Sequence, residues 1–169
     1  MQEVVLIVAM SCNGVIGHKN EIPWMGQIPV DMAWFRDHTL GKTMIIGRKT
    51  YESMGSKPLP GRQTVVITSK PESIAPAKNL QVASSFEEAM RLCKDLDEVV
   101  IAGGGQVYTQ ALPFVTKIIE TGLDAEFEGD TFFPDVNVNN LEIEYRGRTE
   151  VDDFNKYACN FFILKGKVV

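Results

Sequence analysis

Short apolar runs recur along the chain, and turn-forming residues bound each of them. Four of these runs cover residues 4–10, 43–46, 64–67 and 99–102. An uninterrupted apolar run of this length is typical of a strand that is buried on both faces, as in a parallel sheet covered by helices. The pattern therefore predicts an α/β fold built on a parallel sheet.

Helical patterns alternate with these runs. The tetrapeptide SFEE at residues 85–88 has the form of a capping box, and apolar positions at helical spacing follow it. We expect Cys93 to pack in that apolar stripe as a small hydrophobic side chain. The stripe consists of Phe86, Ala89, Met90 and Cys93, and further helices are expected from about Val30 to before Gly41, after Gly47, and after Gly105 from about Gln106.

The C-terminal part of the chain lacks a helical pattern. Two strand-like segments, residues 141–148 and 157–166, are separated only by the polar, turn-like stretch 149–155. Strands joined in this way are expected to be antiparallel partners. We therefore expect residues 1–169 to form a single domain, with a mostly parallel mixed sheet, helices on both faces and a C-terminal antiparallel hairpin at one edge. Ligands bind such sheets beyond the carboxyl ends of the strands.

Length and charge narrow the class of protein. A chain of 169 residues, of which 44% are hydrophobic, can bury one substantial core. Its net charge of −5 opposes nucleic-acid binding, which favours a basic surface. The start MQEVVLIVAM lacks the cationic residues of an export signal, and no apolar stretch approaches the roughly 18 residues of a membrane span. These features predict a cytoplasmic protein with neither nucleic acid nor membrane as a partner.

Cysteine and histidine are scarce. The three cysteines, Cys12, Cys93 and Cys159, are odd in number and lie far apart, which predicts neither a disulfide framework nor a zinc site. Because the only histidines are His18 and His38, a histidine-rich metal centre is not expected either.

Three expected strands end in loops that carry glycines, hydroxyls or cations. Their sequences are AGGGQ at residues 102–106, GRKT at 47–50 and TSK at 68–70. Glycines permit close backbone approach, and the first amides of a helix attract anions. Each loop taken alone is equally compatible with an ordinary turn or with solvent-exposed cations. Three such loops, all at the carboxyl ends of strands, together favour a dinucleotide site.

One carboxylate stands in an unusually apolar segment, PWMGQIPVDMAWF at residues 23–35. An acidic residue in the first turn of a helix often caps free amides, which is the structural alternative for Asp31. Asp31 shares a helical face with Phe35, however, and desolvation there would raise its pKa and demand a partner. A flat heterocycle with an amidine-like edge offers two parallel donors to a carboxylate. We therefore predict that Asp31 is the polar anchor of an apolar pocket.

Six segments in order make the chain resemble the dihydrofolate reductase family, in its short bacterial form. They are VIGHKNEIPW followed by Asp31, Phe35 and Thr39, then GRKTYESMG, PLPGR, VVITSKP, VIAGGGQVY and LDAEFEGDTFFP. The resemblance implies NADPH-dependent reduction of 7,8-dihydrofolate to 5,6,7,8-tetrahydrofolate, which supplies one-carbon metabolism. It also implies a monomer that binds diaminopyrimidine and pteridine antifolates.

The resemblance assigns substrate roles to particular residues. Asp31 would bind the 2-amino group and N3 of the pterin and favour protonation of N5 indirectly, with water as the immediate donor. Thr121 would hydrogen-bond that carboxylate, and Trp24 completes the catalytic group. Arg62 would grip the glutamate α-carboxylate, a bidentate task suited to guanidinium. The walls of the pterin and aminobenzoyl pocket would be Ile7, Val8, Met32, Phe35, Met54 and Leu59.

The resemblance also assigns the cofactor site. The segment from Gly17 to Trp24 would be a mobile loop that closes over the nicotinamide, supported by Asp130. Ser69 and Lys70 would lie at the 2′-phosphate. The cofactor-binding residues would be Ala9, Ile16, Gly17, Asn20, Gly47, Arg48, Lys49, Thr50, Thr68, Ser69, Lys70, Ala102, Gly103, Gly104, Gly105, Gln106, Val107 and Tyr108.

Three departures from the family pattern bear on this site. The connection from Trp24 to Asp31 is longer than usual, Gln106 stands where some relatives carry an arginine, and Ala102 is smaller than the aliphatic residue common there. Two other functions compete with the reductase. One is a pyrimidine reductase of riboflavin synthesis, which would need neither the acid nor the arginine. The other is a catalytically silent folate- or nucleotide-binding protein.

Overall fold

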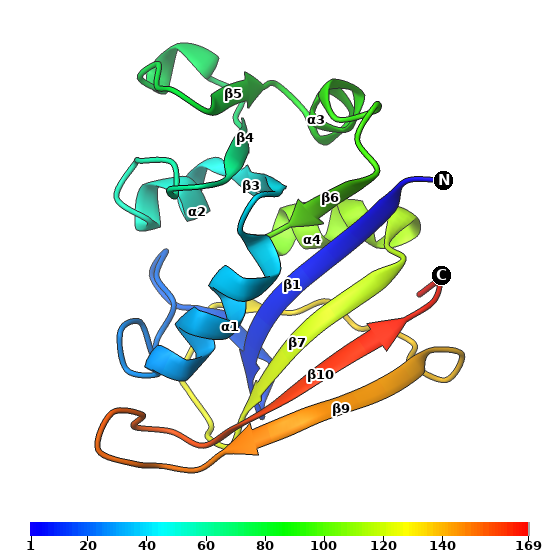
Figure 1. Ribbon diagram of the computed structural model, residues 1–169. Coiled ribbons are helices and arrows are strands. Elements are labelled where there is room, and N and C mark those ends of the chain that lie inside the picture. The colour runs from blue at the N-terminus through cyan, green and yellow to red at the C-terminus, as the bar shows by residue number, and fades with distance from the viewer. Residues whose placement is uncertain (169) are drawn as a thin grey trace.

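The computed structural model describes residues 1–168 and contains a mixed sheet of eight strands (Figure 1). The six strands from β5 to β7 are parallel to one another, β10 runs antiparallel to β7, and β9 runs antiparallel to β10. The strand order is β5 (Leu80–Ala83), β4 (Gln63–Ile67), β3 (Thr43–Gly47), β6 (Glu98–Ile101), β1 (Glu3–Ser11), β7 (Lys117–Leu123), β10 (Cys159–Lys165) and β9 (Glu142–Thr149). The expected parallel sheet with an antiparallel hairpin at one edge is confirmed.

Helices cover both faces of this sheet, as expected. On one face lie α1 (Pro29–Thr39) and α2 (Arg48–Ser53), and on the other lie α3 (Phe86–Leu92) and α4 (Gly105–Ala111). Successive residues of β1 alternate between the faces, since Leu6 packs with Phe86 whereas Ile7 packs with Phe35. Because both faces are buried, an uninterrupted apolar run is the sequence such a strand requires.

The remaining elements are short. A two-stranded antiparallel sheet joins β2 (Val15–Gly17) to β8 (Thr131–Phe132), and 3₁₀ turns occupy Pro71–Ser73 and Leu112–Phe114. No helix within residues 1–168 combines the length and the apolar composition that crossing a membrane requires.

The capping box predicted before α3 is present but altered. The Ser85 hydroxyl accepts the backbone N–H of Glu88 at 3.0 Å, as expected. The Glu88 carboxylate accepts the backbone N–H of Ser84 at 2.9 Å instead of that of Ser85. This carboxylate therefore satisfies a donor one residue earlier in the chain, and the helix still begins at the predicted place.

Glu120 interrupts the apolar centre of the sheet, between Val8 of β1 and Phe162 of β10. Burial raises the pKa of its carboxyl group, and no compensating interaction from the described residues lowers it. The folded chain thus holds this proton more tightly than the unfolded chain does. Stability is consequently lost as pH rises above the unfolded pKa, and at neutral pH the carboxylate destabilises the fold.

Glu120→Gln should therefore raise the free energy of unfolding at pH 7 by about 1 kcal/mol. The gain should shrink as the pH falls through the raised pKa, because the native side chain is then neutral as well. Urea unfolding at pH 7 and pH 5 measures both values. Glu142→Gln, on the exposed edge strand β9, is the matched control and should change little. Equal stability of Glu120→Gln and the native chain at pH 7 would contradict the assigned cost.

Candidate functional site

Asp31 lies in the first turn of α1, but its side chain does not cap the helix. Its Oδ1 atom instead accepts the hydroxyl proton of Thr121 in β7 at 2.7 Å. Thr121 stands opposite Ala9 in the neighbouring strand β1. This carboxylate therefore links α1 to the sheet. The alternative interpretation, that Asp31 caps the free amides of its own helix, is wrong.

The surroundings of Asp31 disfavour its charge. Burial raises the pKa of Asp31, and the hydrogen bond from Thr121 opposes that rise. Burial raises the pKa of the nearby Cys159 thiol, and the charge of Asp31 adds to that rise. Within residues 1–168 no lysine, arginine or histidine forms an ion pair with Asp31. A desolvated carboxylate without a cation favours a ligand that brings its own donors.

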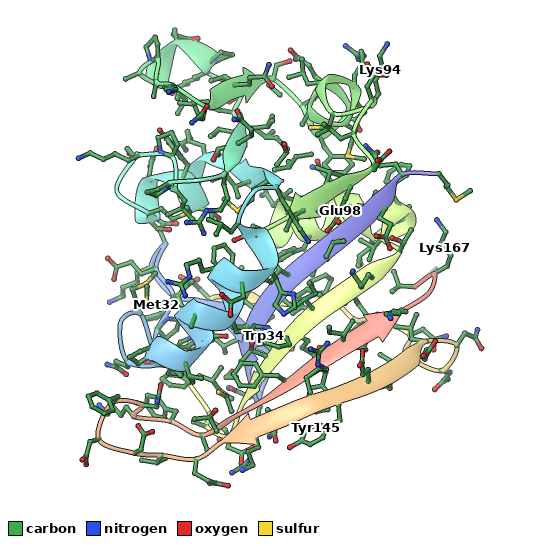
Figure 2. The ribbon with its side chains drawn as sticks, viewed as in Figure 1. Met32, Trp34, Lys94, Glu98, Tyr145 and Lys167 are labelled. Atoms are coloured by element: carbon green, nitrogen blue, oxygen red, sulfur yellow. The ribbon has the colours of Figure 1, made fainter. Side chains whose placement is uncertain are left out.

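Apolar side chains of α1, the sheet and the segment after α2 surround the approach to this carboxylate. Ile7, Phe35 and Leu59 share one cluster, which Trp34 also joins. Trp34 also packs against Phe161, with ring centroids 4.8 Å apart. In Figure 2 Trp34 lies between α1 and the strands, whereas Met32 projects from α1 on the side away from β7 and β10. Met32 is accordingly 58% exposed.

Three residues expected at the site, Val8, Trp24 and Met54, belong to other clusters than Ile7, Phe35 and Leu59. The Val8 side chain packs on the α3 and α4 face, so only its backbone can border a ligand beside α1. Trp24 is buried in a neighbouring cluster, which shares Trp34 with that of Phe35, and packs against Phe127 with ring centroids 5.1 Å apart. Met54 packs in the cluster that contains Tyr51 of α2. Ala102 packs against both this cluster and the cluster of Phe35. Because successive side chains of a strand point to opposite faces, Val8 faces away from the side of the sheet that Ile7 and α1 share.

Arg62 is held near the far end of α1. Its Nε donates to the carbonyl oxygen of Pro60 at 3.0 Å, and its Nη1 donates to Thr39 Oγ1 at 3.1 Å. The residue is only 8% exposed, and burial and the neighbouring Arg36 lower the pKa of its guanidinium. Within residues 1–168 no carboxylate forms an ion pair with it. A fixed, buried cation without an acid favours an anionic ligand.

Asp31 and Arg62 lie at opposite ends of α1. Arg62 is bonded to Thr39, which lies eight positions after Asp31 in α1. At the helical rise of 1.5 Å per residue these positions are roughly 12 Å apart along the axis. The arrangement suits a molecule with donor groups at one end, an apolar middle and an anion at the other end.

The three loops expected to form a dinucleotide site meet at the same edge of the sheet. Gly47 N–H donates to the carbonyl oxygen of Gly103 at 2.8 Å, and Ala102 N–H donates to that of Ile45 at 3.0 Å. Gly47 also stands opposite Ile67, the last residue of β4 before the third loop. The predicted convergence of the three loops is confirmed.

Glycine is required in these loops for two physical reasons. Gly103 has a φ of +121°, a value that favours glycine. A Cβ atom on Gly104 would lie 3.2 Å from Thr50 Oγ1, so the loops after β3 and β6 pack closely. No side chain caps α2 or α4, and neither helix has an acid in its first turn. The edge therefore offers free amides and exposed cations, which fit the phosphates of a dinucleotide.

The residues expected at the cofactor differ in burial and fall into buried, partly buried and exposed groups. Thr68, Val107 and Tyr108 are buried, and the Tyr108 hydroxyl donates to the carbonyl oxygen of Ile7 at 2.7 Å, so these three serve mainly as scaffold. Arg48 forms an ion pair with Glu52 at 2.8 Å. The exposed members are Asn20, Arg48, Lys49, Ser69, Lys70 and Gln106, and Ala9, Ile16, Gly17, Gly47, Thr50, Ala102, Gly104 and Gly105 are partly buried.

The segment from Gly17 to Trp24 is fastened by Asp130. Lys19 N–H donates to Asp130 Oδ2 at 2.9 Å, and Asp130 N–H donates to the carbonyl oxygen of Gly17 at 3.1 Å. The hydrogen bond from Lys19 is the main reason that the pKa of Asp130 is lowered. The extra length before Asp31 forms an exposed turn around Gly26, after which Ile28 is buried.

One contact at this site was not anticipated from the sequence. The Asn155 Oδ1 atom, in the loop between β9 and β10, accepts the backbone N–H of Val30 at 3.0 Å. The sequence VDDFN predicts a polar turn, and an aspartate before an asparagine is typical of such turns. No spacing or periodicity relates two residues that are 125 positions apart.

The chain is similar to known proteins in both sequence and fold. Residues 3–166 match the family model described as dihydrofolate reductase. The chain is 41% identical over 162 residues to dihydrofolate reductase of Haemophilus influenzae, covering 96% of this chain and 98% of that protein. It is 42% identical over 160 residues to dihydrofolate reductase type 3 of Salmonella typhimurium, covering 94% and 95%. Dihydrofolate reductase of Enterococcus faecalis, complexed with NADP(H) and RAB-propyl, superposes with a TM-score of 0.83 at 32% identity and covers 97% of this chain and 96% of its own.

Proposed function

This chain belongs to the dihydrofolate reductase family, and from that premise we propose which of its side chains bind dihydrofolate and NADPH. Its activity is the NADPH-dependent reduction of 7,8-dihydrofolate to 5,6,7,8-tetrahydrofolate. The family match decides against the pyrimidine reductase of riboflavin synthesis. The observation that carries the residue assignments is the Asp31 carboxylate, hydrogen-bonded to Thr121 and without a cationic partner in the described chain.

Asp31 binds the pterin ring by its amidine-like edge. Its carboxylate accepts the donors of the 2-amino group and N3, while Thr121 holds one carboxylate oxygen in place. The ring then lies among Ile7, Phe35 and their neighbours, which exclude water from its faces. This negative charge favours protonation of N5, for which water is the immediate donor. When bound, NADPH supplies the hydride that reduces C6 of the pterin.

Arg62 binds the glutamate tail of dihydrofolate. It is bonded to Thr39, which lies about 12 Å from Asp31 along the axis of α1, a separation that suits the extended length of the substrate. Thr39 and the Pro60 carbonyl orient the guanidinium before the ligand arrives, so little freedom is lost on binding. Phe35 and Leu59 line the apolar middle of this path.

The NADPH phosphates bind at the edge where α2 and α4 begin. Arg48, Lys49 and Thr50 would hold the phosphates, Ser69 and Lys70 the 2′-phosphate, and the glycines from Gly103 to Gly105 would approach the nicotinamide and pyrophosphate. Exposed cations, uncapped helix starts and packed glycines support this assignment. Gln106 adds no charge, so selectivity for NADPH over NADH rests on the cations of the other two loops.

Arg48→Ala should weaken NADPH binding about tenfold and NADH binding less, because a charged contact to phosphate is worth about 1.5 kcal/mol. The dissociation constants of both cofactors, measured by fluorescence titration, give the comparison. Glu52→Ala is the matched variant, since it releases Arg48 from the ion pair. It should leave NADPH binding unchanged or tighten it. Equal losses for NADPH and NADH in Arg48→Ala would move this side chain away from the added phosphate.

The mobile segment from Gly17 to Trp24 covers the nicotinamide. Its attachment to Asp130 supports a closed arrangement, in which water is kept from the reacting atoms. We also propose a cytoplasmic monomer formed by one domain, which binds diaminopyrimidine and pteridine antifolates through Asp31.

The decisive assay for the activity follows NADPH absorbance after dihydrofolate is added, with NADH in parallel. We expect rapid NADPH oxidation that requires dihydrofolate and is slower with NADH. Binding of both ligands without oxidation would instead support the silent binding protein.

A further inference from the structure

The first turn of α1, which carries Asp31, has no cap from its own side chains. The N-cap residue Ile28 has only an apolar side chain, and Pro29 has no N–H to satisfy. The N–H of Asp31 donates to the carbonyl oxygen of Ile28 at 3.0 Å. The Val30 N–H has no acceptor within the helix, and Asn155 Oδ1 accepts it at 3.0 Å. The cap of this helix therefore comes from another part of the chain.

Asn155 is itself firmly held. It is 6% exposed, and its backbone N–H and its Nδ2 donate to Asp152 Oδ1 at 2.6 and 3.1 Å. The same oxygen accepts the N–H of Phe154 at 2.9 Å. These donors together lower the pKa of Asp152, which keeps it an acceptor. The side chain that caps α1 thus has little freedom to move.

The same loop also holds the unusual connection before α1. We define the β9–β10 loop as residues 150–158. Its Lys156 N–H donates to the carbonyl oxygen of Gln27 at 2.9 Å. Figure 1 shows this loop beside the start of α1. Thr39, which accepts the hydrogen bond from Arg62, lies at the other end of the helix. The loop therefore bonds the chain on both sides of the buried Ile28, at Gln27 and at Val30.

We propose that Asn155 is a positioning residue for the reduction of dihydrofolate, which it serves by fixing the first turn of α1 and so the direction of the Asp31 carboxylate. This inference rests on the proposed role of Asp31. Asp31 directly follows the capped Val30, so backbone motion at Val30 displaces the carboxylate from Thr121. A carboxylate that must meet two donors at once tolerates little displacement.

Asn155→Ala is the first test. We expect the hydride step, measured by single-turnover loss of NADPH absorbance, to slow about fivefold, which corresponds to the loss of a helix cap worth about 1 kcal/mol. The KM for dihydrofolate should rise, while the dissociation constant of NADPH should stay the same. The apparent pKa of the hydride step should also move upward, because the hydrogen bond from Thr121 is the interaction that lowers the pKa of Asp31.

The matched control is Asn137→Ala. Asn137 lies in the loop between β8 and β9, where its Oδ1 accepts the backbone N–H of Asn139 at 3.0 Å. It should change neither the hydride step nor its pH profile. All variants are compared well below their melting temperatures, so that any loss of fold stability is measured separately.

A double-mutant comparison separates positioning from general destabilisation. Because Asn155 acts through Asp31, Asn155→Ala should slow the hydride step far less in an Asp31→Asn background than in the native chain. The double variant Asp152→Asn with Asn155→Asp exchanges the two side chains. It keeps the amide–carboxylate pair and leaves a carboxylate oxygen to accept the Val30 N–H. It should recover most of the rate that Asn155→Ala loses.

Two results would overturn the proposal. One is an Asn155→Ala protein that is less stable but has the native hydride rate and pH profile. The other is an equal fold-loss with and without the Asp31 carboxylate. Failure of the underlying assignment is distinguishable, because Asp31→Asn alone would then keep native turnover.

Discussion

Asp31→Asn should reduce turnover at pH 7 by roughly 10²-fold while the fold is retained, because a group that assists proton transfer typically contributes at least this factor. An asparagine presents one acceptor and one donor where the pterin edge needs two acceptors. It also removes the negative charge that favours protonation of N5. Steady-state NADPH oxidation across pH measures the effect.

The loss should be smaller at low pH. Dihydrofolate then arrives partly protonated from solution, so the help of the carboxylate is needed less. The matched control is Asp37→Asn, an exposed acid on the same helix that should keep native turnover. Native activity of Asp31→Asn at every pH would remove Asp31 from the reaction.

The same substitution should make the free protein more stable at neutral pH. Burial raises the pKa of Asp31 in the folded chain, so the stability of the protonated form is lost as pH rises above the unfolded value. Asparagine avoids that cost, and thermal melting at pH 7 should show a higher Tm than the native chain. At low pH the difference should fade. A gain in stability together with a loss of turnover is the pattern of a functional residue that is unfavourable for folding.

Arg62→Ala should weaken dihydrofolate binding by roughly 10- to 150-fold, since charge-assisted hydrogen bonds contribute about 1.5–3 kcal/mol. The guanidinium is buried and oriented before binding, and it has no acidic partner in residues 1–168. A pterin that lacks the glutamate tail makes no contact there, so its affinity should be unchanged. Titration with both ligands gives the comparison.

Two further variants sharpen the test of Arg62. Arg62→Lys keeps the charge but not the fork geometry, so its loss should be intermediate. Arg36→Ala removes the neighbouring exposed cation and should alter affinity less than threefold, a range typical of screened surface charges. If the truncated pterin lost as much affinity as dihydrofolate, Arg62 would lie outside the tail site.

Elements whose sequence pattern matches their burial could be predicted from the sequence. The four strands with continuous apolar runs, β1, β3, β4 and β6, lie close to their expected bounds. The strand β7 was not expected as part of the sheet, because Glu120 and Thr121 interrupt its apolar run. Thr121 donates a hydrogen bond to Asp31, so one of the two polar residues that interrupt the apolar run serves the candidate site. The short strands β2, β5 and β8 offer too few residues for a pattern to emerge.

The site could be predicted in part. The loops after β3, β4 and β6 were expected to lie together at one edge of the sheet, and the structure brings them together there. The alternation of side chains along β1 places Val8 on the face covered by α3 and α4. Val107 and Tyr108 pack in the core, and a motif match does not distinguish such buried residues from residues that contact a ligand. Sequence alone also left open whether Asp31 caps its helix.

The sequence by itself determined the alternation of helices and buried strands, the three loops with glycines, hydroxyls and cations, and an acid among aromatic residues, because these depend on near neighbours in the chain. Only the tertiary structure decided which distant groups meet. Thr121 reaches Asp31, Thr39 orients Arg62, and Asn155 caps Val30, each through a single hydrogen bond between remote segments. Such bonds depend on how the helices and strands pack together, and no periodicity within one segment contains that information.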